Sequence, residues 1–341
     1  MAFHQYDEEL LGRRMRRLRF PRLRRSSVYL LVIDVTLIVL LLCEIEPLIT
    51  LLRRNEELFG PRFRPDEKPE TGTDPEAQTI PHILHQTCAT DIIPEAWVHS
   101  QQSCREAYSN FTYMLWTDEL ARDFIAREYP WFLHVWDGYP FPIQRADSIR
   151  YFVLHHFGGI YLDMDTLCKE PFPVDGIGHD GPHALFKSTL PTGVTNDFMM
   201  STARHPAFAV AISRLPVFYK ITRLWARLEP YVAIMLSSGP LFLTLALKDF
   251  LLGESCLPSP AVQVIHFARL EPYITDLESS TWHRKDTKLL MWLGERPWSW
   301  FGLGAVGLVI GVYVFNRALL LLCKAPRRIL SVAHSLKRQK H

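Results

Sequence analysis

The segment HHFGGIYLDMDTLCKEPF, residues 155–172, contains a Gly-Gly pair, a short apolar run and two aspartates, Asp163 and Asp165. A Gly-Gly pair is typical of a helix end, and the run from Ile160 to Leu162 predicts a short strand. Side chains alternate along a strand, so both aspartates project the same way if strand geometry continues past Leu162. Two carboxylates on one side repel each other unless a cation joins them. The alternative is a turn that carries two solvated acids.

Strand and helix patterns alternate on both sides of this segment. Residues 80–88 and 111–116 each contain a strand pattern, and Thr117 follows as a helix cap. The apolar face of that predicted helix consists of Leu120, Phe124 and Ile125. Residues 143–157 again have helical spacing. The alternation predicts an α/β domain with a mainly parallel sheet, in which ligands gather at the carboxyl ends of strands.

The acidic pair predicts a site for Mn²⁺ or Mg²⁺, because both ions take oxygen ligands. Such ions keep several waters and commonly bind one or two carboxylates together with substrate phosphates, so the sparse set favours a phosphate-bearing ligand. On the preceding helix, Asp147 and Arg150 are three residues apart and share a face. Arg150 can bind phosphate or sugar oxygens as a planar donor fork, with Asp147 orienting it or accepting from a sugar hydroxyl. The alternative for this pair is an ordinary surface ion pair.

The N-terminal region of the 341-residue chain combines a basic segment with an apolar run. Eight arginines lie between Arg13 and Arg25, and residues 28–42 follow as an apolar run. Either a membrane anchor or a cleaved signal peptide begins in this way. No small-residue cleavage site follows, since Glu44, Ile45, Glu46 and Pro47 come next. We therefore favour an uncleaved anchor.

A second apolar run covers residues 301–323, and Gly307 and Gly311 in it have the spacing that lets another helix approach closely. The residues after it are basic without an acid, and basic flanks stay in the cytosol. Both termini are therefore predicted to be cytosolic, and the middle of the chain lumenal. Basic ends can also bind nucleic acid, but an apolar span beside each end argues against a nucleic-acid partner. The predicted parts are a basic tail (1–25), an anchor (26–45), a stem (46–79), a lumenal domain (80–297), a transmembrane helix (298–323) and a second basic tail (324–341).

Three features of the middle region remain open at this point. The apolar stretch at residues 231–247 has the composition of a third span, but Ser-Ser-Gly-Pro interrupts it, and we predict buried core. Asn110-Phe111-Thr112 is a glycosylation acceptor triplet. Four cysteines in an oxidising compartment form two bridges in one of three connectivities or stay as buried thiols: Cys88, Cys104, Cys168 and Cys256.

Six segments resemble, in the same order, the DXD-containing glycosyltransferases that include fungal inositol phosphorylceramide mannosyltransferases. They are IPHILHQT (80–87), YMLWTDE (113–119), YPFPIQRADSIRYFVLHHFGGIYLDMD (139–165), HPAF (205–208), SSGPLFLT (237–244) and SSTWH (279–283). The third segment is the most specific. Its spacing of aspartates, arginine and tyrosine is also similar to the sugar-binding region of large clostridial glucosylating toxins.

The resemblance implies a GT-A-like, Rossmann-like nucleotide-sugar domain between two transmembrane helices, and metal-dependent transfer with retention of configuration. It implies that Asp165 ligates the metal, that Asp163 contacts ribose and the metal's water shell, and that Asp147 and Arg150 contact the sugar. It further implies nucleotide contacts from His85, Gln86, Thr87 and Tyr161, and a segment closing over the diphosphate with Ser280, Trp282 and His283. His283 is a third metal-ligand candidate or a structural histidine. Cys88 replaces a tryptophan common in relatives after HQT, which leaves base stacking there unsupported.

The acceptor side is less determined. Asn196 and Asp197 in TNDF are candidates, with a capped loop as the alternative. The resemblance implies a Golgi mannosyltransferase that uses GDP-mannose and a phosphoinositol sphingolipid acceptor. The alternatives are transfer to a protein-linked glycan, or a non-catalytic membrane subunit that binds a partner through Gly307 and Gly311. No activated serine, cysteine or lysine motif points to a protein nucleophile.

Overall fold

The computed structural model describes residues 25–63, 79–174, 182–254, 257, 259, 261–277, 292 and 296–338. The chain divides into two compact units. Pro47–Trp300 form one unit, and Met1–Glu46 together with Phe301–His341 form the other. The candidate site lies in the first unit.

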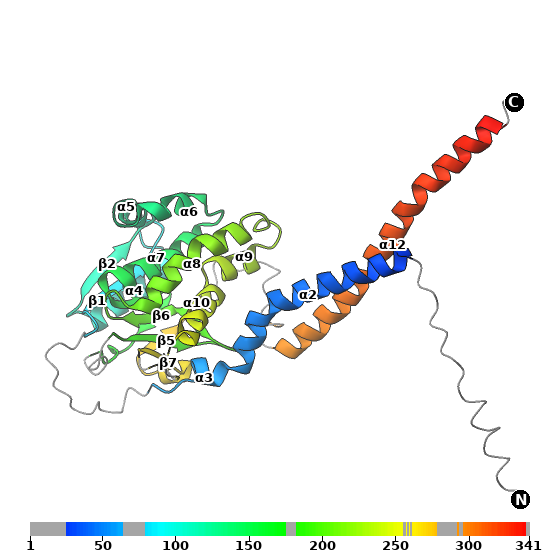
Figure 1. Cartoon of the computed structure of the whole chain (residues 1–341). Coiled ribbons are helices and arrows are strands. Elements are labelled where there is room, and N and C mark those ends of the chain that lie inside the picture. Colours follow the sequence, from blue (N-terminus) through cyan, green and yellow to red (C-terminus); the bar gives the residue numbers. More distant parts are fainter. Residues whose placement is uncertain are drawn as a thin grey trace, which may run out of the picture. The chain divides into compact units, whose positions relative to one another are not determined.

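A six-stranded mixed sheet is the centre of the Pro47–Trp300 unit (Figure 1). Its strands are β1 (Ile83–Thr87), β2 (Thr112–Trp116), β3 (Gly159–Leu162), β5 (Ala184–Ser188), β6 (Val194–Ser201) and β7 (Val262–Ile265), in the spatial order β2-β1-β3-β6-β5-β7. Only β6 runs against its neighbours β3 and β5, and the other pairings are parallel. A second small sheet pairs β4 (Thr166–Cys168) with β8 (Ile274–Asp276). The predicted α/β class with a mainly parallel sheet is confirmed.

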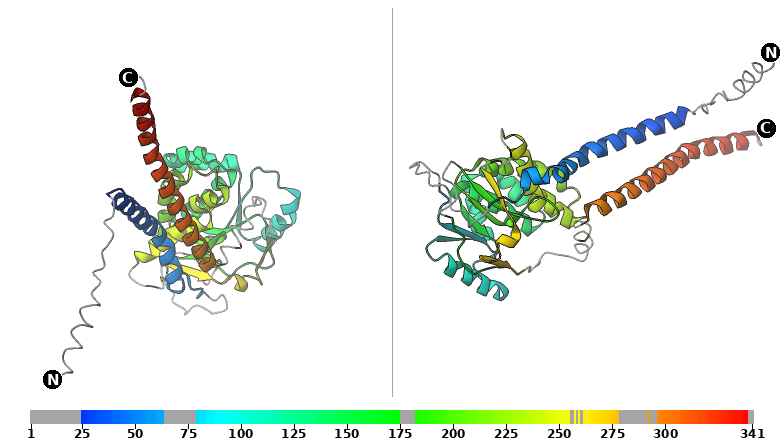
Figure 2. Two further views of the ribbon diagram at one scale, coloured as in Figure 1. Left: turned by 90° about the vertical axis from the view of Figure 1, so that its right-hand side faces the viewer. Right: turned by 90° about the horizontal axis from the view of Figure 1, so that it is seen from below.

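Helices cover both faces of the large sheet (Figure 2). The helices of this unit are α3 (Asn55–Phe59), α4 (Glu95–Ala107), α5 (Asp118–Glu128), α6 (Leu133–Gly138), α7 (Pro142–Phe157), α8 (Pro206–Thr222), α9 (Pro230–Ser237) and α10 (Pro240–Leu252), with 3-10 turns η1 (Pro130–Phe132) and η2 (Phe267–Arg269). In one apolar cluster, the helices from α5 through α10 pack against one face of the sheet. The other joins α4, β4 and β8 with the opposite face.

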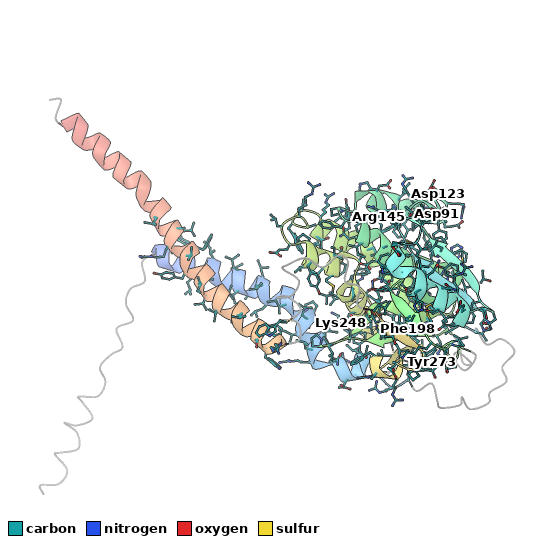
Figure 3. All side chains as sticks on the ribbon, turned by 180° about the vertical axis from the view of Figure 1, so that it is seen from behind. Asp91, Asp123, Arg145, Phe198, Lys248 and Tyr273 are labelled. Atoms are coloured by element: carbon teal, nitrogen blue, oxygen red, sulfur yellow. A yellow bond between two sulfur atoms is a disulfide. The ribbon has the colours of Figure 1, made fainter. Side chains whose placement is uncertain are left out.

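The alternation along β3 explains why the sheet has two cores. Ile160 and Leu162 are buried in the α4 cluster, while Tyr161 between them is buried in the α7 cluster. On the α4 side, Phe198 of β6 and Tyr273 both pack on Phe172, with ring centroids 5.7 and 5.0 Å away (Figure 3). A strand that is buried on both faces reads as a continuous apolar run, which is what the sequence has at 160–162.

The local predictions near the site agree with the structure except at one residue. Helix α7 ends at Phe157 with Gly158 as its C-cap, β3 begins at Gly159, and the Thr117 side chain accepts from the Leu120 amide at 3.2 Å. Phe124 and Ile125 are buried as expected. Leu120, which we placed on the apolar face, is 53% exposed, and Ala121 is buried instead. The predicted stripe was therefore off by one position in the first turn.

The predicted stem differs from the structure. Helix α2 (Arg25–Arg53) continues past residue 45, and Leu51, Leu58 and Phe59 are buried in the cluster that contains α7. Asn55 also holds the β5–β6 turn, because its Oδ1 accepts from the Gly193 amide at 3.2 Å. Residues 47–59 thus belong to the folded unit rather than to a spacer.

Both units contain helices that are long and apolar enough to cross a membrane, judged by length and composition alone. Phe301–Leu319, within α12 (Pro297–Arg338), is long and apolar enough to cross a membrane, and none of its window is buried. Tyr29–Cys43 and Ile45–Arg53 of α2 qualify together if this bent pair is one span. Within their unit, Asn316 of α12 donates to Asp34 of α2 at 2.7 Å. Gly307 and Gly311 have open space around them.

The third apolar stretch packs in the core. Pro230–Leu252 also meets the criterion for a span, but Gly239 separates it into α9 and α10, and 56% of the window is buried. Phe242, Leu243 and Leu247 belong to the cluster that contains α7. These contacts agree with the predicted buried core.

Candidate functional site

The turn between α7 and β3 sets the position of the site. Gly158 and Gly159 have φ values of 69° and 97°, a region that disfavours other residues. A Cβ on Gly159 would lie 2.5 Å from the Ile83 carbonyl oxygen of β1. The turn therefore needs glycine, and it folds α7 back along β3 so that Arg150 faces the end of the strand.

Arg150 is at the centre of a buried polar cluster. Its Nη2 lies 3.0 Å from Asp163 Oδ1 and 3.2 Å from Asp147 Oδ1, and its Nη1 donates to the Asn196 carbonyl oxygen at 2.9 Å. Its guanidinium also lies 4.9 Å from the centroid of the Tyr161 ring. Burial lowers the pKa of Arg150, but Asp163, Tyr161 and Asp147 outweigh it and hold the pKa above its usual value. The interpretation of Asp147 and Arg150 as a surface pair is excluded, since both are about 5% exposed or less.

Asp163 lies directly after β3, where it accepts from the Tyr161 hydroxyl at 2.8 Å. Burial raises the pKa of Asp163 to about 7; Arg150 opposes this shift, and Asp197 and Asp165 add to it. The Asp163 side chain is 25% exposed, and a raised pKa is expected of a partly buried carboxylate that lies beside other acids. A bound cation would favour its ionised form.

Asp147 is held by Asn196, which the sequence analysis gives as an acceptor-side candidate, and by Ser238, which it does not single out. Asn196 Nδ2 donates to Asp147 Oδ1 at 3.1 Å, and Ser238 Oγ donates to Oδ2 at 3.4 Å. Asn196 also contacts the Tyr151 hydroxyl at 3.1 Å, and that hydroxyl donates to the Ser238 carbonyl oxygen at 2.5 Å. Burial raises the pKa of Asp147, with Arg150 and Asn196 opposing. Asn196 is buried, so it supports Asp147 and presents little surface to a second substrate.

Asp197 belongs to a second ionic group, on β5, β6 and β8. Lys187 Nζ pairs with Asp197 Oδ2 and lies 3.7 Å from Asp276 Oδ2. The main-chain carbonyl oxygen of Asp197 accepts from the Asp163 amide at 3.0 Å, so this ionic group adjoins the cluster around Arg150. Burial lowers the pKa of Lys187, and Asp197 with Asp276 and Asp163 more than reverses this. Sequence reasoning missed Lys187 and Asp276 because only the pairing of β5, β6 and β8 brings them here.

The acidic residues fit a divalent cation of the type that keeps water and phosphate ligands. Asp197 Oδ1 is buried beside Lys187 and has no hydrogen-bond partner among the described residues. The charges of Asp197 and Asp165 both raise the pKa of Asp163. Within the described part of the chain, no three histidine, cysteine, aspartate or glutamate side chains form a group that could hold a metal ion. A cation at Asp163 and Asp165 would therefore take its other ligands from a bound molecule, water or undescribed residues.

The predicted nucleotide side contains one residue that offers no free atom. His85 is fully buried, its Nδ1 accepts from Trp116 Nε1 at 3.1 Å, and its Nε2 lies 2.9 Å from the Gly158 carbonyl oxygen. Burial lowers its pKa to about 4. His85 thus joins β1 to the glycine turn as a neutral ring. The predicted direct contact of His85 with the nucleotide base is therefore corrected: its side chain supports the turn behind the site.

Gln86 and Thr87 lie closer to the acidic end of β3. Gln86 Nε2 donates to the Asp163 carbonyl oxygen at 3.4 Å, and Thr87 Oγ1 lies 2.9 Å from the Tyr161 hydroxyl. Thr87 is partly exposed, whereas Gln86 is buried. Ser280, Trp282 and His283 lie outside the described residues, and so does Cys256.

A disulfide braces the segment that follows the aspartates. Cys104 of α4 is bonded to Cys168 of β4, while Cys88 is a buried free thiol. Ser100 Oγ, also on α4, donates to the Met164 carbonyl oxygen at 2.6 Å. Helix α4 therefore fixes the backbone on both sides of Asp165. One bridge of the predicted possibilities is present among the described cysteines.

Comparison with known proteins gave consistent matches. Residues 94–183 match a family described as glycosyltransferase sugar-binding region containing DXD motif. Inositol phosphoceramide mannosyltransferase 2 of Schizosaccharomyces pombe is 39% identical over 228 residues, which are 62% of this chain and 61% of that protein. Inositol phosphoceramide mannosyltransferase 3 of the same organism is 36% identical over 254 residues, 72% of this chain and 67% of that protein.

Two further facts delimit these matches. The chain spans less than two thirds of the length of the first of these relatives. Among solved structures, PaToxG Glycosyltransferase is similar with a TM-score of 0.40 and 17% identity, covering 52% of this chain and 72% of that chain.

Proposed function

Since the chain belongs to the glycosyltransferase family whose sugar-binding region contains a DXD motif, we propose that it transfers mannose from GDP-mannose to inositol phosphorylceramide. The relatives named as inositol phosphoceramide mannosyltransferases support this acceptor and this sugar. Transfer would depend on a divalent cation and retain the anomeric configuration.

The observation that carries the proposal is the guanidinium of Arg150 held between Asp147 and Asp163 at the carboxyl end of β3. The two carboxylates fix the fork, which leaves it preorganised in a poorly hydrated place where developing negative charge is stabilised most. Asp147, itself held by Asn196 and Ser238, would accept from a sugar hydroxyl. A surface pair would have neither the burial nor the second carboxylate.

Asp163 and Asp165 would hold Mn²⁺ or Mg²⁺, with His283 as a candidate third ligand. When bound, the ion supplies charge stabilisation to the departing diphosphate. Lys187 lies beside the same acids and would balance Asp197 when the diphosphate binds. Thr87, which is partly exposed, would line the nucleotide side, with the buried Tyr161, joined to it through the two hydroxyls, and the buried Gln86 behind it. Ser280 and Trp282 would close over the diphosphate, and Asp197 would lie on the acceptor side.

The membrane arrangement belongs to the same proposal. Spans in α2 and α12 would leave both basic ends in the cytosol and the Pro47–Trp300 unit in the lumen of the Golgi. Two spans around one domain would keep its site near the bilayer, where a lipid headgroup is within reach. A regulatory membrane subunit would contact Gly307 and Gly311, which have open space around them.

The test is transfer by the full chain purified in detergent, supplied with GDP-mannose, UDP-glucose or UDP-galactose and with either inositol phosphorylceramide or a mannan oligosaccharide. We expect mannosylated lipid with Mn²⁺ or Mg²⁺ and none with EDTA. Asp165→Ala should abolish transfer, whereas Asp91→Ala, an exposed acid in the loop after β1, should not. Glycan mannosylation in place of lipid mannosylation would refute the acceptor, and full activity of Asp165→Ala would refute the metal assignment.

A further inference from the structure

The end of α8 and the turn after it carry an exposed apolar stripe between cations, which we call the α8 end surface. Its apolar members are Val217, Ile221, Leu224 and Leu228, with exposed fractions of 51%, 57%, 83% and 81%. Its cations are Arg214, Lys220, Arg223 and Arg227, all exposed. Figure 1 shows α8 leading into α9 here.

The stripe is a helical face, because its members recur every three or four residues. Helical hydrogen bonds continue past Thr222, since Ala226 donates to the Thr222 carbonyl oxygen at 2.9 Å and Glu229 to that of Trp225 at 3.3 Å. The opposite face is anchored in the domain by Tyr219, Thr222 and Ala226, which are 6% exposed or less. The stripe therefore projects outward from a rigidly packed helix.

Cations outnumber acids around the stripe, although the exposed acid Glu229 follows Leu228. The sequence from Pro206 to Leu228 contains no aspartate or glutamate. Arg214 is paired with Asp249 of α10 at 3.0 Å, and Arg223 lies 5.8 Å from the Tyr219 ring centroid. A row of large exposed apolar side chains marks an interaction surface, and flanking cations on such a helix are typical of elements that lie in the headgroup region of a membrane.

We propose that the α8 end surface lies against the bilayer, with its four apolar side chains at the boundary between headgroups and acyl chains and its cations on anionic lipid phosphates. Charge complementarity selects this partner, because anionic headgroups match the cations and the acyl region matches the stripe. A bilayer is also the surface that the chain's long apolar helices are suited to enter.

Helix α9 would connect the bilayer contact at the α8 end surface with the candidate site. Helix α9 is eight residues long, about 12 Å, and it follows the surface directly. Gln144 Nε2 of α7 donates to Ser237 Oγ at 2.6 Å, and Ser238 contacts Asp147. Bilayer contact at this surface would thus be connected to the residues that hold Asp147. Delivery of a lipid acceptor is a consequence that rests on the proposed function, whereas bilayer contact itself does not.

The experiment is photo-crosslinking in the full chain, reconstituted in vesicles of phosphatidylcholine and phosphatidylinositol that contain an alkyne-tagged phospholipid. Benzoylphenylalanine replaces Ile221 or Leu224 in separate variants. The matched control replaces Trp131 of η1, which is 54% exposed against 57% for Ile221. We expect tagged lipid on the Ile221 and Leu224 variants and several-fold less on the Trp131 variant. Crosslinks to a polypeptide, or equal lipid labelling at Trp131, would overturn the proposal.

A second arm tests the charges without touching the stripe. Arg223→Glu combined with Arg227→Glu should reduce lipid labelling at Leu224, by up to about five-fold for each charge, when phosphatidylinositol is present. The control Arg127→Glu, at an exposed arginine of α5, should leave labelling unchanged. If charge reversal had no effect on labelling in these vesicles, the headgroup part would be wrong. Absence of mannosyl transfer by the wild-type chain, with lipid labelling at Ile221 and Leu224 as expected, would refute the proposed function alone.

Discussion

Arg150 and Asp163, 13 residues apart in sequence, lie 3.0 Å from each other, Arg150 in the middle of α7 and Asp163 directly after β3. The glycine turn makes this contact possible, and both side chains have further partners: Asp147 and the Asn196 carbonyl oxygen for Arg150, and Tyr161 for Asp163. A cation and two anions that satisfy each other in a buried place resist independent substitution. Removing one partner leaves the others uncompensated.

Arg150→Ala should therefore lower stability as well as activity. Loss of the cation leaves Asp147 buried and charged, and breaking such a pair typically costs about 3–5 kcal/mol. We expect a lower free energy of unfolding in urea and no detectable mannosyl transfer. Arg122→Ala is the control, because the Arg122–Asp137 pair is half exposed and such pairs contribute about 0–1 kcal/mol. Equal stability of the two variants would contradict the central position of Arg150.

Sequence reasoning reached the residues whose neighbours are set by local geometry. Asp147 and Arg150 share a helix face, and Asp163 extends a strand that a Gly-Gly turn folds against that helix, so spacing alone indicates their proximity. Asn196 required the direction of β6: because β6 is antiparallel to β3, its first residues lie beside the last residues of β3. Its inward side chain then supports Asp147, a role that TNDF does not reveal.

Other members could not be inferred because they depend on long-range pairing. Lys187 lies on β5 of the large sheet and Asp276 on β8 of the small sheet, so only the packing of the two sheets brings them together. Ser238 comes from the break in an apolar stretch, and its contact with Asp147 also depends on long-range packing. His85 was assigned to a ligand from its motif, yet the alternation of β1 turns it toward Trp116 and Gly158. Motifs identify positions, and the alternation of side chains along each strand decides which side of the sheet each residue faces.

Lys187→Met should reduce transfer while changing stability less than Arg150→Ala. The lysine neutralises Asp197 next to Asp163, so its loss would add repulsion at the proposed diphosphate site. We expect a fall in kcat/KM for GDP-mannose of about 100-fold, the scale of one lost electrostatic group. The matched control is Lys169→Met, because Lys169 pairs with Glu271 at the surface. Unchanged kcat/KM in Lys187→Met would remove this residue from the site.

The buried histidines should make a destabilising contribution in acid, opposed by Asp163, whose pKa burial raises to about 7. The histidine contribution is therefore measured as a difference in slope between wild type and a histidine variant. Burial lowers the pKa of His85 and His205 to about 4, against about 6.5 in the unfolded chain. Between these values the unfolded state binds more protons, so their contribution is full above pH 6.5 and is lost as pH falls towards 4. Urea unfolding at pH 7 and pH 5 should show this loss. His85→Gln should flatten the dependence, and the surface variant His134→Gln should reproduce the wild-type slope; a steeper slope in His85→Gln would contradict it.

The Cys104–Cys168 disulfide should stabilise the acidic end of β3. The bridge closes a loop with a sequence separation of 64, for which chain entropy predicts about 4 kcal/mol. Cys104→Ser combined with Cys168→Ser should lower Tm and increase hydrogen exchange at residues 163–168, since α4 holds that segment. Cys43→Ser, at an exposed thiol, is the control. If exchange at 163–168 stayed the same, α4 would not depend on the bridge to fix Asp165.

Glycosylation of Asn110 would place the Pro47–Trp300 unit on the lumenal side of the membrane. Asn110 is exposed in the turn between α4 and β2, and Thr112 of the acceptor triplet is also exposed, so a transferase can reach both. Expression of the full chain in a eukaryotic host should give a product that shifts on treatment with peptide N-glycosidase F. Asn110→Gln should abolish the shift, whereas Asn55→Gln, which alters no acceptor triplet, should retain it. A product with no shift, in a host that glycosylates a triplet inserted in another lumenal protein, would contradict the proposed orientation, because an exposed acceptor of this kind in the lumen meets the enzyme during synthesis.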